Sequence, residues 1–180
     1  MTIQEQLLPY HSKLKLRNAN QIDTVVLHCT ELPTLQMARE FGEQIVHKES
    51  GTGNSGHYYI DRDGSVVRYA EDNRVTHHVI GHNENSIGIE LVNLGRYPNW
   101  FHARNQTPTE PYPQSQLDAL KELLRELKAR YPQLATLARH SDLDTKWVAA
   151  EDDPTVQIRR KIDPGALFPW DDILAFWNSL

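Results

Sequence analysis

The stretch Thr24-Val25-Val26-Leu27-His28-Cys29-Thr30 decides how the rest of the chain is interpreted. It is mostly apolar or β-branched up to His28 and contains neither proline nor glycine, so it predicts a buried strand. A histidine at the end of such a strand is held on a rigid element, which suits a ligand that must keep a fixed geometry. Taken alone, it could also be a core histidine that is satisfied by hydrogen bonds, which is the commoner case. The residues that could be its partners lie much later in the chain.

Length and composition exclude several classes of protein. The chain has 180 residues, enough for one domain with its own core, and its net charge of −5 comes without any basic block that would indicate a nucleic-acid surface. Its single cysteine cannot form an internal disulfide. No stretch is apolar enough for a membrane span, and the first twenty residues contain no continuous apolar signal region. We therefore expect a cytoplasmic protein, with export by another route, or after removal of a signal, as the alternative.

The first part of the chain predicts an arm, a strand and a helix. Residues 1–20 are polar and weakly patterned, and we interpret them as an arm that wraps a single domain over residues 21–180. Thr34 is a good N-cap for a helix that runs to about His47. Apolar residues recur in it at helical spacing and are expected to lie in the core. They are Met37, Phe41 and Ile45.

The middle of the chain predicts further strands. His57–Ile60 and Ser65–Tyr69 are short strand-like runs joined by a turn at Arg62-Asp63-Gly64. Ser86–Val92 reads as a second buried strand, yet it contains Glu90. A carboxylate is costly to bury unless it is paired or hydrogen-bonded, so Glu90 requires an explanation.

The second half adds the elements that complete the fold. The pattern predicts a long ordered loop, an amphipathic helix, a short extended segment that delivers His140, an irregular charged segment and a final helix. Their ranges are 93–113, 117–131, 134–139, 142–160 and 170–177. Strands alternate with helices, which indicates an α/β domain with a single sheet flanked by helices.

Three residues could form a metal site. His28, His140 and Asp163 together would be two imidazoles and one carboxylate, a common catalytic zinc set that leaves a fourth position for water. Their spacing alone is weak evidence, because they are scattered and the chain offers nine histidines. The residues by themselves leave both interpretations of His28 open.

Five blocks of sequence resemble the zinc-dependent N-acetylmuramoyl-L-alanine amidases, a family that includes AmpD-type enzymes, phage amidases and peptidoglycan recognition proteins. The blocks are Val-Val-Leu-His28-Cys-Thr, Gly-His57-Tyr-Tyr-Ile-Asp-Arg-Asp-Gly64, His78-Val-Ile-Gly-His-Asn-Glu-Asn-Ser86-Ile-Gly-Ile-Glu90-Leu, Arg139-His140 and Arg-Lys161-Ile-Asp163-Pro-Gly165. They follow the family order over nearly the whole chain. The resemblance implies a mixed, twisted sheet with helices packed around it. It also implies cleavage of the amide between N-acetylmuramic acid and L-alanine in peptidoglycan or its muropeptide fragments.

The same resemblance implies roles for individual residues. It makes His28, His140 and Asp163 the ligands of one Zn²⁺ per chain, in the Asp-Pro-Gly form typical of AmpD-type enzymes. It makes Glu90 and Lys161 catalytic. The alternatives are that Glu90 is a strand-end carboxylate satisfied by the backbone and that Lys161 is a surface lysine.

Further positions of the resemblance carry open questions. His57 and His78 are candidates to bind substrate, or else to support the ligands from behind. Some phage relatives have a catalytic tyrosine just before the first of these histidines, where this chain has Gly56, so that role is absent or taken by Glu90. The segment from His78 to Ser86 has the phage length, which leaves the glycan preference open.

One alternative remains for the whole protein and one for the aromatic residues of the long loop. A module of the same fold could bind muropeptides without cutting them, although the complete ligand set favours an enzyme. Aromatic residues around Trp100 could line a glycan groove or pack in the core. The pattern leaves the oligomeric state open.

Cys29 adjoins a proposed ligand and invites assignment as another. Successive side chains of a strand point to opposite faces, so a cleft-facing His28 sends Cys29 to the packed side. There a thiol behaves as a small apolar group, and we expect it to take no part in metal binding.

Overall fold

The computed structural model describes residues 1–180, and its centre is a six-stranded sheet. In chain order the strands are Ile3–Glu5 (β1), Thr24–Cys29 (β2), Tyr58–Ile60 (β3), Val66–Arg68 (β4), Ser86–Leu91 (β5) and Thr136–Arg139 (β6). In space their order is β1-β4-β3-β5-β2-β6. Only β3 and β4 pair antiparallel, which makes the sheet mixed. The predicted α/β class and mixed sheet are confirmed.

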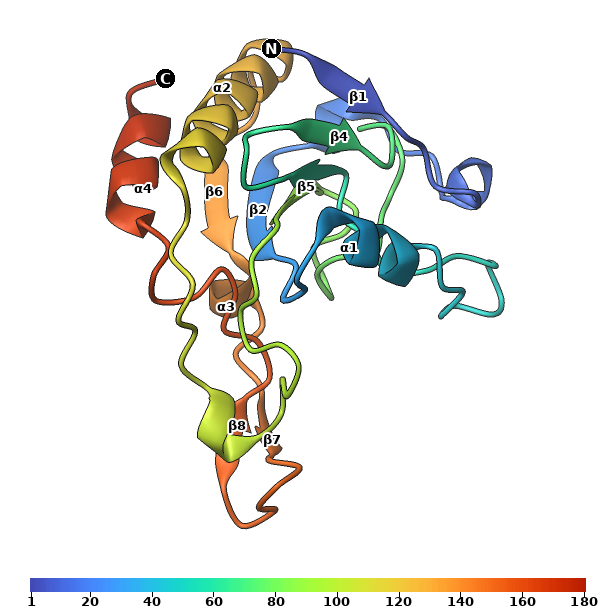
Figure 1. The fold of residues 1–180 in the computed structure, drawn as a ribbon. Coiled ribbons are helices and arrows are strands. Elements are labelled where there is room, and N and C mark those ends of the chain that lie inside the picture. Colours follow the sequence, from blue (N-terminus) through green and yellow to red (C-terminus); the bar gives the residue numbers. More distant parts are fainter.

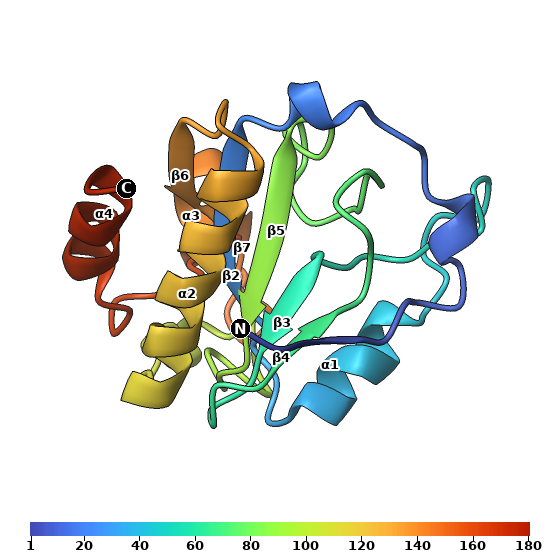
Figure 2. The same ribbon diagram turned by 90° about the horizontal axis from the view of Figure 1, so that it is seen from above.

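Helices cover both faces of this sheet (Figures 1 and 2). Helices α2 (Gln114–Arg130) and α4 (Trp170–Asn178) lie on one face, and α1 (Leu35–Gly42) lies on the other. The apolar face of the predicted amphipathic helix packs in the main core through Leu120, Leu124 and Leu127, as does Trp177 of α4. Both helices therefore form where the sequence predicts them. None of the helices is long and apolar enough to cross a membrane.

Strand alternation separates the face of the sheet that lies in the main core from the face that carries His28 and Glu90. Val25, Leu27 and Cys29 of β2 all lie in the main core under α2 and α4. The intervening His28 therefore points to the opposite face of the sheet. The same alternation in β5 buries the isoleucines and Leu91 and turns Ser86, Gly88 and Glu90 to the face of His28. The predicted placement of Cys29 on the packed side is confirmed.

The first helix differs from its prediction. Thr34 is its N-cap, since its hydroxyl accepts a hydrogen bond of 3.1 Å from the backbone N–H of Met37, but the helix ends at Gly42 and not near His47. Phe41 and Ile45 are 53% and 51% exposed, so the prediction that they lie in the core is wrong. Periodicity identifies which side chains share a face, whereas the fold decides whether anything covers that face. Met37 alone of the three packs on the second core cluster.

The segment predicted to be irregular between 142 and 160 is partly regular. A short helix, α3 (His140–Leu143), is followed by a hairpin of β7 (Trp147–Ala149) and β8 (Gln157–Arg159) that projects from the body (Figure 1). This second, two-stranded sheet also corrects the expectation of a single sheet. Strands of three residues are too short to show a period of two, which is why the pattern did not reveal them.

The segment before residue 21 is packed against the domain. Strand β1 pairs parallel with β4 at the sheet edge, and Leu8, Tyr10 and Leu14 are buried in the second core cluster. The division of the chain at residue 20 stays a prediction. The long loop 93–113 is ordered as expected and holds one 3₁₀ turn, Ala103–Asn105; two others lie at His11–Lys13 and Ala19–Gln21.

Candidate active site

The sheet brings His28 and His140 together. Strands β2 and β6 run parallel, with Leu27 opposite Arg139. The residues that follow these two, His28 and His140, therefore lie side by side. The Nδ1 atoms of the two histidines lie 3.0 Å apart. Both side chains are buried. Residues 112 positions apart in sequence thus share one edge of the sheet because their strands are neighbours.

Asp163 completes the cluster from a separate segment. Its Oδ2 lies 2.9 Å from Nδ1 of His140 and 3.2 Å from Nδ1 of His28. The segment is fixed by its backbone, since Ser141 N–H donates to the Asp163 carbonyl over 3.0 Å and the Tyr112 hydroxyl donates to that of Pro164 over 2.7 Å. All three predicted ligands therefore converge.

The electrostatics of this cluster suit a cation. Burial, and next the charge of His140, lower the pKa of His28 to about 4, which leaves its imidazole neutral at neutral pH. Burial would raise the pKa of Asp163, but the charge of His140 and the close contacts of the carboxylate with both histidines hold it well below its ordinary value. The second carboxylate oxygen, Oδ1, is buried without a partner. One donor atom of each residue lies within 4.8 Å of the others, an arrangement that could hold a metal ion.

Glu90 stands beside the cluster. It is the residue of β5 directly opposite His28 on β2, and its Oε1 lies 4.0 Å from His28 Nδ1. Burial, and next the charge of Asp163, raise the pKa of Glu90 to about 8, with Lys161 opposing the shift. The carboxylate is 15% exposed and lines a cleft, so it is not merely a strand-end group satisfied by backbone.

Lys161 lies on the same cleft, two residues before Asp163. It is partly buried, and its positive charge lowers the pKa of both Glu90 and Asp163. Lys161 thus lies on the cleft with Glu90 and Asp163 and not on an open surface.

The cleft has a volume of about 480 Å³, within the range of small-molecule sites. Phe41, Trp100 and Phe101 contribute aromatic side chains to its lining, and Phe41 and Trp100 pack edge to face with 6.2 Å between ring centroids. Trp100 also donates its indole N–H to the Glu31 carbonyl over 2.9 Å. Trp100 meets both interpretations, because it lines the cleft and also packs against the second core cluster.

The two remaining candidate histidines occupy different environments. His57 is completely buried and does not line the cleft; its Nδ1 accepts a hydrogen bond of 3.0 Å from Gly88 N–H, and its Nε2 lies 2.9 Å from the Arg74 carbonyl. This geometry favours support over substrate contact. His78 does line the cleft, and its Nδ1 lies 2.9 Å from Nε2 of His28.

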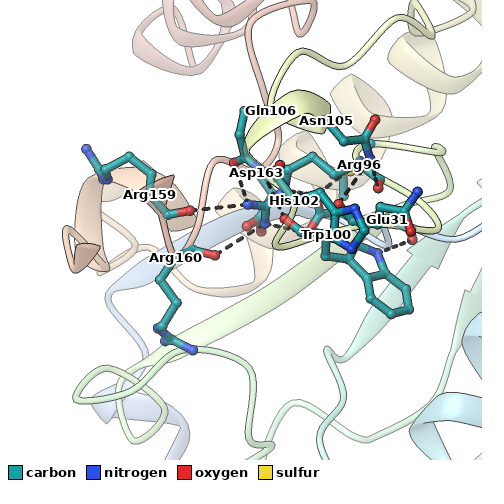
Figure 3. A network of polar contacts seen from close by, with 12 residues as sticks. Glu31, Arg96, Trp100, His102, Asn105, Gln106, Arg159, Arg160 and Asp163 are labelled. Carbon is teal, nitrogen blue, oxygen red and sulfur yellow. Dashed lines mark hydrogen bonds and ion pairs between the residues drawn. The ribbon is translucent and has the colours of Figure 1, made fainter. Parts of the chain in front are cut away.

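One network around the site was not foreseen from the sequence (Figure 3). Arg96, which is 1% exposed, forms a two-pronged ion pair with Glu31, from Nε to Oε1 over 2.7 Å and from Nη2 to Oε2 over 2.9 Å. Its guanidinium also donates to the carbonyls of Arg159 and Arg160, each over 3.2 Å. Arg96 thereby ties the segment after β2 to the segment that carries Lys161 and Asp163. No local motif marks this pair, because 65 positions separate its members.

Comparisons with known proteins identify the family of this chain. A family model described as N-acetylmuramoyl-L-alanine amidase matches residues 18–166. An endolysin of Enterobacteria phage K11 is 32% identical over 126 residues, which cover 69% of this chain and 75% of that endolysin.

Solved structures show the same fold. The amidase LysC from Clostridium intestinale matches with a TM-score of 0.68 at 25% identity, covering 99% of this chain and 98% of that one. Drosophila PGRP-LB matches with a TM-score of 0.59 at 18% identity, covering 81% and 85%, and shares the fold. The family model spans most of the chain and includes every residue of the cluster. The chain therefore belongs to the N-acetylmuramoyl-L-alanine amidase family, enzymes that cleave the amide bond between N-acetylmuramic acid and the L-alanine of the stem peptide.

Proposed function

We propose that this amidase is a zinc hydrolase in which His28, His140 and Asp163 hold one zinc ion per chain. The observation that carries the proposal is the convergence of three buried donor atoms within 4.8 Å of one another. Two imidazoles and a carboxylate are a donor set that zinc accepts in catalytic sites. A bound zinc ion would polarise the scissile carbonyl and lower the pKa of the attacking water.

Glu90 is proposed as the general base and acid. Its carboxylate adjoins the cluster, and a pKa of about 8 lies close to neutrality, where one group can both take and return a proton. It accepts a proton from the attacking water and then delivers it to the nitrogen of the departing L-alanine. Its fixed place on a central strand keeps the carboxylate in position for both transfers.

Lys161 is proposed to stabilise negative charge on the scissile carbonyl oxygen. It lines the same cleft as Glu90 and Asp163, and its positive charge acts on both carboxylates. Positive charge placed there in advance stabilises the transition state more than the neutral amide.

The substrate is peptidoglycan or a muropeptide derived from it. We propose that the aromatic lining formed by Phe41 and Trp100 contacts the sugar or the apolar parts of the stem peptide. A cytoplasmic location, with export as the alternative, stays a prediction from the sequence, which cell fractionation would test.

The experiment combines metal analysis with product analysis. Protein purified without added metal should contain about one zinc per chain, and chelation should abolish activity. Intact sacculi and a soluble anhydromuropeptide are then incubated with the protein, and mass spectrometry should find free stem peptides from at least one of them. Glu90→Ala should retain zinc and lose roughly 100-fold or more in kcat, the usual scale for a general acid–base group. Muropeptide binding without any product would instead identify a non-catalytic module, and full activity in metal-free protein would overturn the zinc assignment.

A further inference from the structure

A chain of polar contacts leads from His28 away from the metal cluster. His28 Nε2 lies 2.9 Å from Nδ1 of His78, and His78 Nε2 lies 3.1 Å from the hydroxyl oxygen of Ser86. The Ser86 hydroxyl in turn donates to the backbone carbonyl of His82 over 2.6 Å. Every member of this chain except the last can act as donor or acceptor, whereas a carbonyl oxygen can only accept.

The carbonyl therefore sets the direction of the whole chain. The single hydroxyl proton of Ser86 goes to the His82 carbonyl, so Ser86 Oγ must accept the proton of His78 Nε2–H. Neutral His78 then has a free lone pair on Nδ1, which accepts from His28 Nε2–H. The reverse direction would turn the Ser86 proton towards His78 and leave two oxygens 2.6 Å apart with no hydrogen between them.

The direction matters because a neutral imidazole carries only one ring proton. With that proton on Nε2, Nδ1 of His28 has a free lone pair, and Nδ1 is the atom that lies near His140 and Asp163. Without the chain, Asp163 Oδ2, which lies 3.2 Å from Nδ1, would attract the proton to that nitrogen and block it.

The position of the His78 ring is built into strand β5. A Cβ added at Gly88 would stand 2.6 Å from His78 Nδ1 and 2.7 Å from its Cγ, so the ring occupies space that only glycine leaves open. Ser86 is fixed from the N-terminal segment, since Arg17 Nη1 donates to its carbonyl over 2.7 Å. Arg17 is buried and lies just before the first residue of the family match.

We propose that His78, Ser86 and Gly88 are positioning residues that hold the ring proton of His28 on Nε2 and thereby present Nδ1 to the metal. The inference rests on the proposed role of His28 as a ligand. Histidine ligands commonly donate their second N–H to a carboxylate, a backbone carbonyl or water. Here the acceptor is a neutral imidazole, which fixes the ring without adding negative charge next to the site.

Nuclear magnetic resonance of the metal-free protein tests the proposal directly. Long-range nitrogen–proton spectra of protein with isotope-labelled histidine report which ring nitrogen carries the proton. We expect Nε2 in both His28 and His78, with the signals assigned from His28→Ala and His78→Ala. A proton on Nδ1 of His28 in the unsubstituted protein would overturn the proposal. This readout needs no zinc, so it is separate from failure of the zinc assignment itself.

Variants connect the proton position to metal affinity, measured by competition with a chelator. Ser86→Ala and Gly88→Ala should populate the other tautomer of His28 and weaken zinc binding by about 10- to 100-fold, the usual effect of removing such a partner. His82→Ala is the matched control, because it keeps the backbone carbonyl and should change neither quantity. Weaker zinc binding in Ser86→Ala with the proton still on Nε2 would show that Ser86 acts in another way and would refute the inference. If a variant does not fold, the spectrum of the unsubstituted protein still decides.

Discussion

Glu90 lies directly against Gly56, so that a Cβ added at position 56 would stand 2.9 Å from Cγ of Glu90. The next nearest atom would be the carbonyl oxygen of Gly88, at 3.1 Å, which belongs to backbone and cannot move aside easily. The two positions thus compete for one space. In some phage relatives a tyrosine at position 56 has a catalytic role, and we expect this role to be either absent here or taken by Glu90. The close contact fits the second alternative, which stays a prediction.

Gly56→Ala should therefore displace Glu90 while leaving the metal cluster intact. We expect kcat to fall by about 10-fold, part of the contribution of a general acid–base group, with zinc content unchanged. Steady-state kinetics and elemental analysis of the same preparation measure both quantities. An alanine variant with unchanged kcat would show that Glu90 can shift without losing its function, or that it has no role in proton transfer.

Much of this fold could be predicted because its central strands carry strong patterns. Val25 and Leu27, or Ile87 and Ile89, alternate with residues that face the cleft, and α2 has a clear apolar stripe. The prediction was wrong for Phe41 because helical spacing defines a face without showing that another element covers it. Here that face forms part of the cleft lining.

The site itself could be proposed from the sequence only through resemblance. The spacing of His28, His140 and Asp163 specifies no geometry until β2 and β6 are known to be neighbours. The contacts that support the site could not be predicted from the sequence for the same reason. Nothing local in the sequence indicates that Arg96 pairs with Glu31, since the contact depends on how a long loop folds over the end of a strand.

The Arg96–Glu31 pair leads to a prediction about stability. Arg96→Ala removes the guanidinium of a buried ion pair and leaves the Glu31 carboxylate unpaired. Such a change typically costs about 3–5 kcal/mol of unfolding free energy. Chemical denaturation of the variant and of the unsubstituted protein measures the difference. The variant should also bind zinc more weakly, because the carbonyls of Arg159 and Arg160 lose their donors near Asp163.

Arg62→Ala is a suitable comparison for that experiment. Arg62 also forms a two-pronged pair, with Glu110, but its side chain is 30% exposed. The loss should therefore be smaller, and zinc affinity should be unaffected. Equal losses in the two variants would argue against a special role for the buried pair.

Cys29→Ser tests the limits of the ligand set. The thiol lies in the main core on the face of β2 opposite His28, so the serine variant should keep its zinc and most of its activity. A stability loss of about 1 kcal/mol is expected, as is usual for a single substitution. His28→Ala should lose both metal and activity. A folded serine variant without zinc would mean that the ligand assignment is wrong.

Buried His57 should make the protein sensitive to acid. Burial, and next the charge of Arg17, lower its pKa to about 3, while Asp72 and the Arg74 carbonyl oppose this shift. Between pH 6.5 and 3 the unfolded chain binds a proton at this residue and the folded chain does not, so the unfolding free energy falls as the pH falls. One such group contributes about 1.4 kcal/mol per pH unit over this window.

His57→Asn keeps an acceptor for the Gly88 N–H and removes the titration. In metal-free protein, where zinc loss cannot contribute, its unfolding free energy should therefore decline less steeply with acid than that of the unsubstituted protein. The other buried histidines titrate in both proteins and cancel in the difference. Parallel curves from pH 6.5 to 3 would show that His57 is protonated in the folded state as readily as in the unfolded chain.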